Sequence, residues 1–272
     1  MDTIFSKSNS NVKLVRSLNE KKHRLKNNAF YLEGIKVVNE ILDKDRAIDI
    51  MFIAYSKSIL ENLNGGKSLL NRLENLKDIK VLDFEENIFK YMTDTVTPQG
   101  VLAVIKIPNY DILEELKNNK KNIVILDRVQ DLGNIGTIVR SCNAFDIDII
   151  LCTKDTADIY SPKALRSTMG GVLNTKIIYF NDLTIIDNLK KLGYIVVSTS
   201  LKTENSLENI DFNNKKYAFV MGNEANGVSD ELFSKSDMLV KIPMTDKIES
   251  LNVGVATSII LYEQYRNKSK NI

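Results

Sequence analysis

The sequence predicts an α/β protein whose C-terminal part holds a mainly parallel sheet, preceded by a smaller α/β domain. Short apolar runs of the strand type alternate with helical patterns along most of the 272 residues. Hydrophobic residues make up 43% and charged residues 26%, which allows a sizeable core. Pro108 and Asn109 interrupt the alternation. We therefore expect a first domain over 1–107, a linker over 108–121 and a second domain over 122–272.

The N-terminal elements follow from local apolar spacing. The turn sequence Asn64-Gly65-Gly66 interrupts one longer helical pattern. The expected helices cover 12–18, 35–42, 59–76 with this interruption, and 88–92. The expected strands cover 30–32, 49–54, 81–82 and 100–107.

The C-terminal elements are more regular. Residues 123–126 read Ile-Val-Ile-Leu, an apolar run typical of a strand buried on both faces. The expected strands cover 123–126, 147–151, 176–179, 194–198, 217–221 and 239–242. The expected helices cover 135–145, 161–170, 183–192 and 251–265. Because ligands of parallel sheets bind beyond the carboxyl ends of the strands, the loops after them are the candidate site.

The scarce residues exclude several kinds of chemistry. The chain has one histidine, His23, and two cysteines, Cys142 and Cys152. These three residues cannot supply a structural zinc site or a disulfide framework, so we expect no metal. His23 lies in a basic, polar stretch, which argues against serine–histidine–acid catalysis. No apolar run approaches a membrane span of about 18 residues, and the first ten residues lack a signal-peptide core, so we expect a cytoplasmic protein.

Charge is concentrated near the start of the chain. The net charge is only +2, but residues 7–26 carry a local charge of +6, because Glu20 is their single acid. The basic residues there are Lys7, Lys13, Arg16, Lys21, Lys22, Arg24 and Lys26. Such clustering is the electrostatic footprint of phosphate binding. The alternative is a solvated basic helix face.

The first candidate loop follows strand 123–126. Asn134 is expected at the N-cap of the next helix, where a short polar side chain satisfies free amides. Arg140 comes six residues later, among the apolar residues Ile138, Val139 and Phe145. We therefore expect an arginine on a largely buried helix, which requires a partner or a functional anion.

The second candidate loop follows strand 217–221 and reads Gly222-Asn-Glu224-Ala-Asn-Gly227. Its glycines and asparagines permit unusual backbone angles and the close approach of a ligand. The loop matches neither the dinucleotide pattern G-x-G-x-x-G nor a P-loop. Considered alone, it is more typical of an ordinary tight turn than of a site.

The third candidate loop follows strand 239–242. Ser250 is expected to cap the last helix. Asn252, Gly254 and Ala256 are small or polar residues in the first turns, where helix propensity favours larger side chains. Small residues there let a ligand or another backbone approach closely, although a packed helix start is the plain alternative.

Together the three loops resemble one family. The motifs are N-x-G-x-x-x-R at 134–140, G-N-E-x-x-G at 222–227, and I-P-M at 242–244 followed by S-L-N-V at 250–253. In this order they resemble the SpoU/TrmH family of RNA ribose 2′-O-methyltransferases, of the SPOUT class, over about 122–266. The first hundred residues also resemble this family's substrate-binding domain, which is similar to small ribosomal RNA-binding proteins. Residues 21–24 and 30–34 carry this second resemblance.

The resemblance implies a cofactor, a knot and a partner. The methyl donor is S-adenosylmethionine, held by backbone groups near Gly222, Ile242 and Leu251. The C-terminal sheet ends in a trefoil knot, with the chain after Ile242 threaded through an earlier loop. Two such domains pair as a homodimer, with the active site near the interface. The residues expected to line or hold the cofactor are Ser198, Thr199, Ser200, Gly222, Ile242, Leu251 and Asn252.

The resemblance also implies roles for polar residues of the three loops. We expect Arg140 to grip an RNA phosphate, which can accept the ribose proton, and to stabilise the developing oxyanion. A literal base role for Arg140 is disfavoured, because a guanidinium rarely gives up its proton. Asn134 orients Arg140 or the ribose, and Glu224, Ser250 and Asn252 complete the polar wall.

The basic stretch then becomes the RNA grip. The residues expected to contact RNA are Lys13, Arg16, Lys21, Lys22 and Arg24, with Arg140 at the site. The N-terminal domain favours 23S rRNA as the substrate, and tRNA is the alternative. Two rival interpretations remain. The Asn134/Arg140 pairing argues against a SPOUT enzyme that methylates bases. The presence of Arg140, Glu224 and Asn252 argues against a catalytically silent RNA-binding module. No G-x-G-x-x-G follows a strand, so a dehydrogenase is excluded.

Overall fold

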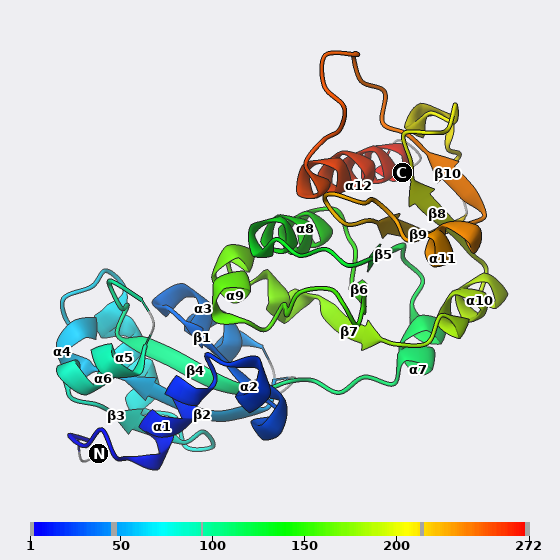
Figure 1. Ribbon diagram of the computed structural model, residues 1–272. Coiled ribbons are helices and arrows are strands. Elements are labelled where there is room, and N and C mark those ends of the chain that lie inside the picture. Colours follow the sequence, from blue (N-terminus) through cyan, green and yellow to red (C-terminus); the bar gives the residue numbers. More distant parts are fainter. Residues whose placement is uncertain (1–2, 45–47, 94, 213–214, 270–272) are drawn as a thin grey trace. The chain divides into compact units, whose positions relative to one another are not determined.

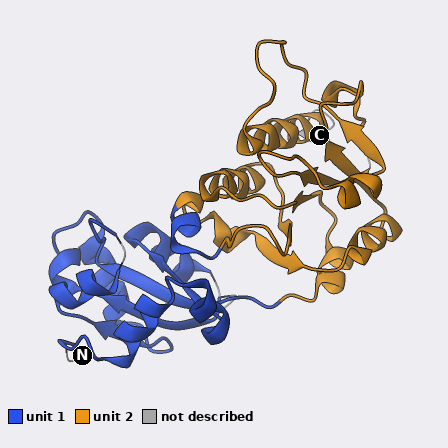
Figure 2. Cartoon of the chain, viewed as in Figure 1, with its two compact units in different colours: residues 1–109, 160–166 blue, residues 110–159, 167–272 orange. Residues whose placement is uncertain are grey.

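The computed structural model describes residues 3–44, 48–93, 95–212 and 215–269. The chain folds into two compact units (Figure 2). Unit 1 comprises Met1–Asn109 together with the short segment Tyr160–Arg166. Unit 2 comprises Tyr110–Ile159 and Ser167–Ile272.

Unit 1 is a four-stranded sheet flanked by helices (Figure 1). Its strand order is β1-β4-β2-β3, in which β4 is antiparallel to both neighbours and β2 pairs with β3 in parallel. The strands are β1 (Ala29–Glu33), β2 (Ile50–Tyr55), β3 (Val81–Asp83) and β4 (Val101–Lys106). The helices are α1 (Ser10–Ser17), α2 (Lys21–Asn27), α3 (Ile35–Asp43), α4 (Lys57–Leu60), α5 (Gly66–Glu74) and α6 (Glu86–Met92).

Helices α1 and α6 cover one face of this sheet. Val12 and Val15 of α1 and Phe89 of α6 are fully buried in a cluster with Phe52 and Val104 of the strands. The predicted helices did not include residues 21–27, a polar stretch without apolar periodicity. Helix α2 forms there nevertheless.

Unit 2 is built on a six-stranded sheet of order β10-β8-β9-β5-β6-β7, and every adjacent pair is parallel. The strands are β5 (Ile123–Leu126), β6 (Ile149–Thr153), β7 (Lys176–Phe180), β8 (Tyr194–Thr199), β9 (Lys216–Met221) and β10 (Met238–Val240). The helices after Tyr110 are α7 (Ile112–Asn118), α8 (Leu132–Ala144), α9 (Pro162–Thr168), α10 (Thr184–Lys191), α11 (Asp230–Ser234) and α12 (Val253–Ser269). Short 3₁₀ turns cover Gly171–Asn174 and Leu207–Asn209.

The two faces of the six-stranded sheet have different covers. Alternate strand residues such as Ile125 and Val220 pack against Leu116 of α7, Leu189 of α10 and Leu232 of α11. Successive strand residues point to opposite faces, so the intervening ones face the other layer. That layer holds α8 and α12, which lie side by side (Figure 1). The predicted fold class, a parallel α/β sheet after a small α/β domain, is therefore confirmed.

Parallel strands place the ends of β5, β9 and β10 at one edge of the sheet. The loops that follow them are the three singled out by sequence, so they emerge at the same edge. The segment between β10 and α12 projects from this unit (Figure 1).

Membrane-spanning helices and metal-binding clusters are both absent from the described part of the chain. It has no helix long and apolar enough to cross a membrane. Among those residues there is also no group of three or more histidine, cysteine or acidic side chains that could hold a metal ion. Cys142 and Cys152 are both buried free thiols, and burial raises the pKa of each.

Candidate active site

An aspartate of the loop between β5 and α8 caps the helix that follows. Asp131 is the N-cap of α8, and its Oδ1 accepts a hydrogen bond from the Asn134 amide at 2.8 Å. The expectation that Asn134 caps this helix is therefore wrong. Asn134 lies in the first turn, where its side chain is free of capping and reaches residues of the other loops.

The loop after β9 needs its glycines. A Cβ atom on Gly222 would lie 2.1 Å from the Gly227 carbonyl carbon, so only glycine fits there. Gly227 itself has φ of 68°, in the left-handed region. The amides and carbonyls of Asn223 and Gly227 pair at 2.9 Å, which closes the turn and presents Glu224 at its tip.

Glu224 accepts hydrogen bonds from three donors of the first loop. Its Oε1 accepts from Asn134 Nδ2 at 3.0 Å and from the Asp131 amide at 3.1 Å. Its Oε2 accepts from the Gln130 amide at 3.3 Å. Partial burial raises the pKa of Glu224, but these bonds together outweigh burial and hold the pKa below its ordinary value. Glu224 is therefore a carboxylate at neutral pH that joins the first two loops.

The third loop joins the same network through Asn252. Its Oδ1 accepts from the amides of Gly254 at 2.9 Å and Val255 at 3.2 Å, which caps α12. The expectation that Ser250 is this cap is wrong, because Asn252 directly precedes the first helical residue and Ser250 is exposed in the loop. Asn252 Nδ2 donates to Asn134 Oδ1 at 2.7 Å.

A continuous polar relay thus runs from Asn252 through Asn134 to Glu224. It connects residues 118 and 90 positions apart in the sequence. Three of the five residues proposed for the chemistry are therefore brought into hydrogen-bond contact. The central member, Asn134, is 8% exposed, so the relay is fixed by packing as well as by hydrogen bonds.

Arg140 lies on the same helix but outside the relay. Helix α8 is largely buried, as expected, but Arg140 itself is exposed, so the expectation of a buried arginine is wrong. The helix presents Thr137, Arg140 and Ala144 to solvent because residues three to four positions apart share one face. Six residues advance a helix by about 9 Å, so Arg140 lies well along α8 from Asn134.

The residues after β8 differ in accessibility. Ser198 is fully buried and shares a 2.6 Å hydrogen bond with Ser236, so its hydroxyl is used within the fold. Thr199 and Ser200 are partly exposed at the end of the strand. The Ser200 amide donates to the Val240 carbonyl at 2.9 Å, which ties this loop to β10.

Some backbone amides at this edge lack a hydrogen-bond partner among the residues that the structure describes. Within the described residues, no hydrogen bond involves the amides of Gly222, Ile242 or Leu251. The family resemblance implies backbone contacts to the cofactor near these three positions. Unpaired amides in the loops after β9 and β10 can donate to a bound polar ligand.

The comparison with protein families identifies this arrangement. The SpoU rRNA Methylase family matches residues 121–262, a span that contains all three loops. The chain belongs to the SpoU rRNA methylase family. The family and the methyltransferase class predicted from the three loops are therefore confirmed.

Relatives match this SpoU protein over nearly its whole length. The 23S rRNA (guanosine(2553)-2′-O)-methyltransferase RlmP of Bacillus subtilis (strain 168) is 31% identical over 262 residues, 96% of this chain and 98% of the relative. The AdoMet-bound rRNA methyltransferase from Sinorhizobium meliloti is 29% identical with a TM-score of 0.85, and 97% of each chain is covered. AviRb from Streptomyces viridochromogenes shows the same fold. It is 21% identical with a TM-score of 0.82, and the match covers 96% of this chain and 100% of AviRb.

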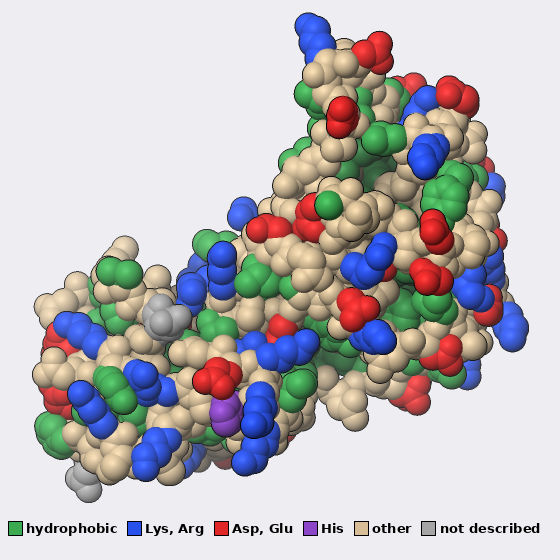
Figure 3. Space-filling model, viewed as in Figure 1, with side chains coloured by type: hydrophobic (Ala, Val, Ile, Leu, Met, Phe, Trp, Pro, Cys, Tyr) green, Lys and Arg blue, Asp and Glu red, His purple; other side chains and the backbone are tan. Residues whose placement is uncertain are grey.

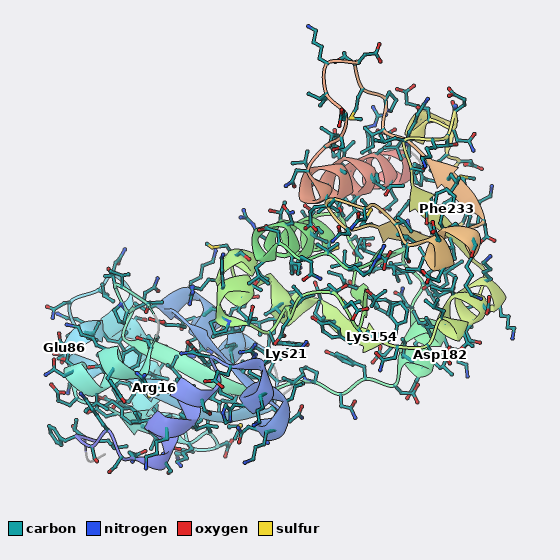
Figure 4. The ribbon with its side chains drawn as sticks, viewed as in Figure 1. Arg16, Lys21, Glu86, Lys154, Asp182 and Phe233 are labelled. Carbon is teal, nitrogen blue, oxygen red and sulfur yellow. The ribbon has the colours of Figure 1, made fainter. Side chains whose placement is uncertain are left out.

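Unit 1 of the SpoU chain carries the basic stretch. An MRM3-like substrate binding domain matches residues 9–103. Figure 3 shows Lys and Arg side chains over α1 and α2, and Figure 4 labels Arg16 and Lys21. Lys13, Arg16, Lys21 and Lys22 are exposed. The Arg16 guanidinium carbon lies 4.0 Å from the centroid of the Tyr91 ring.

Arg24 differs from the other basic residues of this stretch. It is 3% exposed, and its Nη1 donates to the carbonyls of Leu18 at 2.6 Å and Asn19 at 2.9 Å. These bonds tie α2 to the end of α1. The structure therefore gives Arg24 a structural position, which the linear charge pattern could not distinguish from its exposed neighbours.

Sequence reasoning missed two residues that organise the SpoU site. Asp131 precedes Asn134 by three residues, which is a helix-start signal that could have been recognised. Asn223 Nδ2 donates to the Arg128 carbonyl at 2.8 Å and adds another link between the first two loops. No local pattern announces that bond, because its partners are 95 positions apart.

Proposed function

We propose that this protein transfers a methyl group from S-adenosylmethionine to a ribose 2′-hydroxyl of 23S rRNA. The observation that carries the proposal is the Asn252–Asn134–Glu224 relay, which unites the three SpoU loops at one sheet edge. The full-length similarity to the Bacillus subtilis RlmP supports 23S rRNA over tRNA. The intact relay argues against a silent RNA-binding module.

The free amides of Gly222, Ile242 and Leu251 fit S-adenosylmethionine, which offers carboxylate, ribose and adenine acceptors. When bound, this cofactor supplies an electrophilic methyl group on its sulfonium. Thr199 and Ser200 border the same edge and complete the cofactor wall. The buried Ser198 stabilises this end of β8 through its hydrogen bond with Ser236.

Arg140 is the residue that we propose for transition-state stabilisation. Its exposed guanidinium can hold an RNA phosphate, and that phosphate can take the proton from the ribose hydroxyl. The same charge stabilises the oxyanion that develops on the hydroxyl. Asn134 does not orient Arg140 in this proposal, because its side-chain amide is hydrogen-bonded to Glu224 and Asn252. The relay instead fixes the loop against which the ribose is positioned, with Ser250 in the adjoining wall.

We further propose that the exposed cations of unit 1 grip the rRNA. Lys13, Arg16, Lys21 and Lys22 are available to phosphates, whereas Arg24 supports the helices that carry them. Phosphate contacts position RNA and do not select its sequence. An rRNA substrate also implies a cytoplasmic location.

The proposed partner is a second copy of the chain. Val255, Ile259 and Tyr262 lie on one stripe of α12 and are 45%, 36% and 52% exposed. An exposed apolar stripe of this kind is typical of an interface between subunits. Sedimentation should give a dimer, and Tyr262→Glu should shift it to the monomer.

The trefoil knot implied by the resemblance stays a prediction.

The decisive experiment maps 2′-O-methyl groups in total RNA from cells with and without the protein. The expected result is loss of one 23S rRNA methyl group, and guanosine 2553, named for the Bacillus subtilis relative, is the first position to examine. Loss of a tRNA methyl group instead would assign the alternative substrate. Unchanged methylation of all RNA would refute the proposal.

A further inference from the structure

Arg128 has a strained backbone just beyond the C-terminal end of β5. It is the second residue after β5, and its φ is 56°, in the left-handed region that long side chains rarely adopt. Its amide donates to Thr153 Oγ1 at 3.0 Å, and its carbonyl accepts from Asn223 Nδ2 at 2.8 Å. Side chains from the end of β6 and from the loop after β9 therefore hold both backbone groups. Strain that the surrounding structure enforces in this way is typical of functional sites.

The guanidinium of Arg128 is only partly used by the fold. Its Nε is buried and has no hydrogen-bond partner within the described residues. The ion pair with Asp127 is long, with 3.4 Å from Nε to Oδ1, and the Arg128 side chain is 37% exposed. Asp127 also accepts the Ser229 amide at 2.6 Å, so the fold already uses this carboxylate. Since a guanidinium offers five N–H donors, Arg128 retains donors for a ligand.

The position of Arg128 favours an anion of the RNA over the cofactor. The free amides proposed for S-adenosylmethionine follow β9 and β10, whereas Arg128 is bonded to Thr153 at the end of β6, on the other side of β5. Lys154 follows Thr153, is exposed and is labelled in Figure 4. Two cations therefore follow β5 and β6, and Asn134 of the relay lies six residues after Arg128.

We propose that Arg128 binds a phosphate of the RNA substrate beside the target ribose, with Lys154 adding a second positive charge. A guanidinium suits this role because its planar fork can donate two parallel hydrogen bonds to phosphate oxygens. The inference rests on the proposed function and names an RNA contact of that site. It also explains why the chain tolerates a strained arginine at a position where glycine would be relaxed.

The test compares Arg128→Gly, Arg128→Lys and Lys191→Ala in the full-length protein. Glycine adopts φ of 56° without strain, so Arg128→Gly is expected to keep the fold. Lys191→Ala removes one exposed charge from α10, away from the relay, and is the matched control. For each variant we measure the Tm, the Kd for S-adenosylmethionine by calorimetry, and the Kd for a 23S rRNA transcript across a salt series.

Arg128→Gly should retain the wild-type Tm and cofactor affinity. Its slope of log Kd against log salt should be smaller by about 0.7–0.9, which corresponds to roughly five- to eightfold weaker RNA binding at 0.1 M salt. Arg128→Lys should keep the salt slope, because it keeps the charge. Wild-type methyl transfer is measured in parallel, so failure of the proposed function is seen separately from failure of this inference.

Three outcomes would overturn the assignment. Arg128→Gly could bind RNA with the affinity and salt slope of Lys191→Ala, which would remove the phosphate contact. It could lose cofactor affinity alone, which would make the anion the carboxylate of S-adenosylmethionine. It could lose Tm together with both affinities, which would make Arg128 the structural counter-ion of Asp127.

Discussion

Replacing Asn134 by alanine removes the central residue of the relay. The change deletes the bond to Glu224 at 3.0 Å and the bond from Asn252 at 2.7 Å. A hydrogen bond to a charged group contributes about 1.5–3 kcal/mol and a neutral one about 0.5–1.5 kcal/mol. Glu224 is exposed, so screening reduces the first value and the expected loss of stability is about 2 kcal/mol. For a domain of this size, that loss lowers the Tm by about 4–8 °C.

The expected effect on methylation is larger than the effect on stability. Without Asn134, Asn252 is no longer tied to Glu224, so the third loop can shift relative to the first two, which the Gln130 and Asp131 amides still hold together through Glu224. A displacement of about 1 Å at a catalytic site can reduce the rate by about 100-fold. The assay is single-turnover methyl transfer to a 23S rRNA transcript at a temperature well below the Tm of the variant.

Asn143→Ala is the matched control for this prediction. Asn143 lies on the same helix, and its Nδ2 donates to the Gly171 carbonyl at 3.1 Å and to Thr175 Oγ1 at 2.8 Å, outside the relay. It should lose comparable stability and retain the wild-type rate. If Asn134→Ala and Asn143→Ala show equal Tm losses and equal single-turnover rates, the relay has no part in the reaction.

Three other predictions address the same site. Arg140→Ala should retain the wild-type Tm, because the side chain is exposed, and should reduce turnover by about 100- to 1,000-fold; a wild-type rate would remove Arg140 from the mechanism. The pKa of Glu224 is lowered in the folded state, so its stabilising effect is present above its ordinary value of 4.5 and is lost as pH falls through the folded pKa. The Tm difference between wild type and Glu224→Gln should therefore shrink as pH falls below about 4.5, and a constant difference would contradict this. Methyl transfer should persist in excess chelator, whereas loss that zinc restores would show a metal requirement.

The sequence by itself determined most of the elements and their class. The apolar run at 123–126 matches β5 residue for residue, because a strand buried on both faces must be continuously apolar. The alternation of strands and helices required a parallel sheet, and that sheet places the three loops at one edge. The motif spacing within these loops was sufficient to indicate the SpoU family.

Only the tertiary structure decided how individual polar residues are used. A charge pattern could not separate the buried Arg24 from exposed Lys21, because both are basic residues of one short helix and only packing distinguishes them. The exposure of Arg140 was likewise undetermined, since its apolar neighbours point to other faces of α8. The Asn252–Asn134 bond joins residues 118 positions apart, and no local spacing encodes such a contact. Local patterns specify backbone conformation, whereas hydrogen-bond partners between loops depend on how the completed sheet brings distant strand ends together.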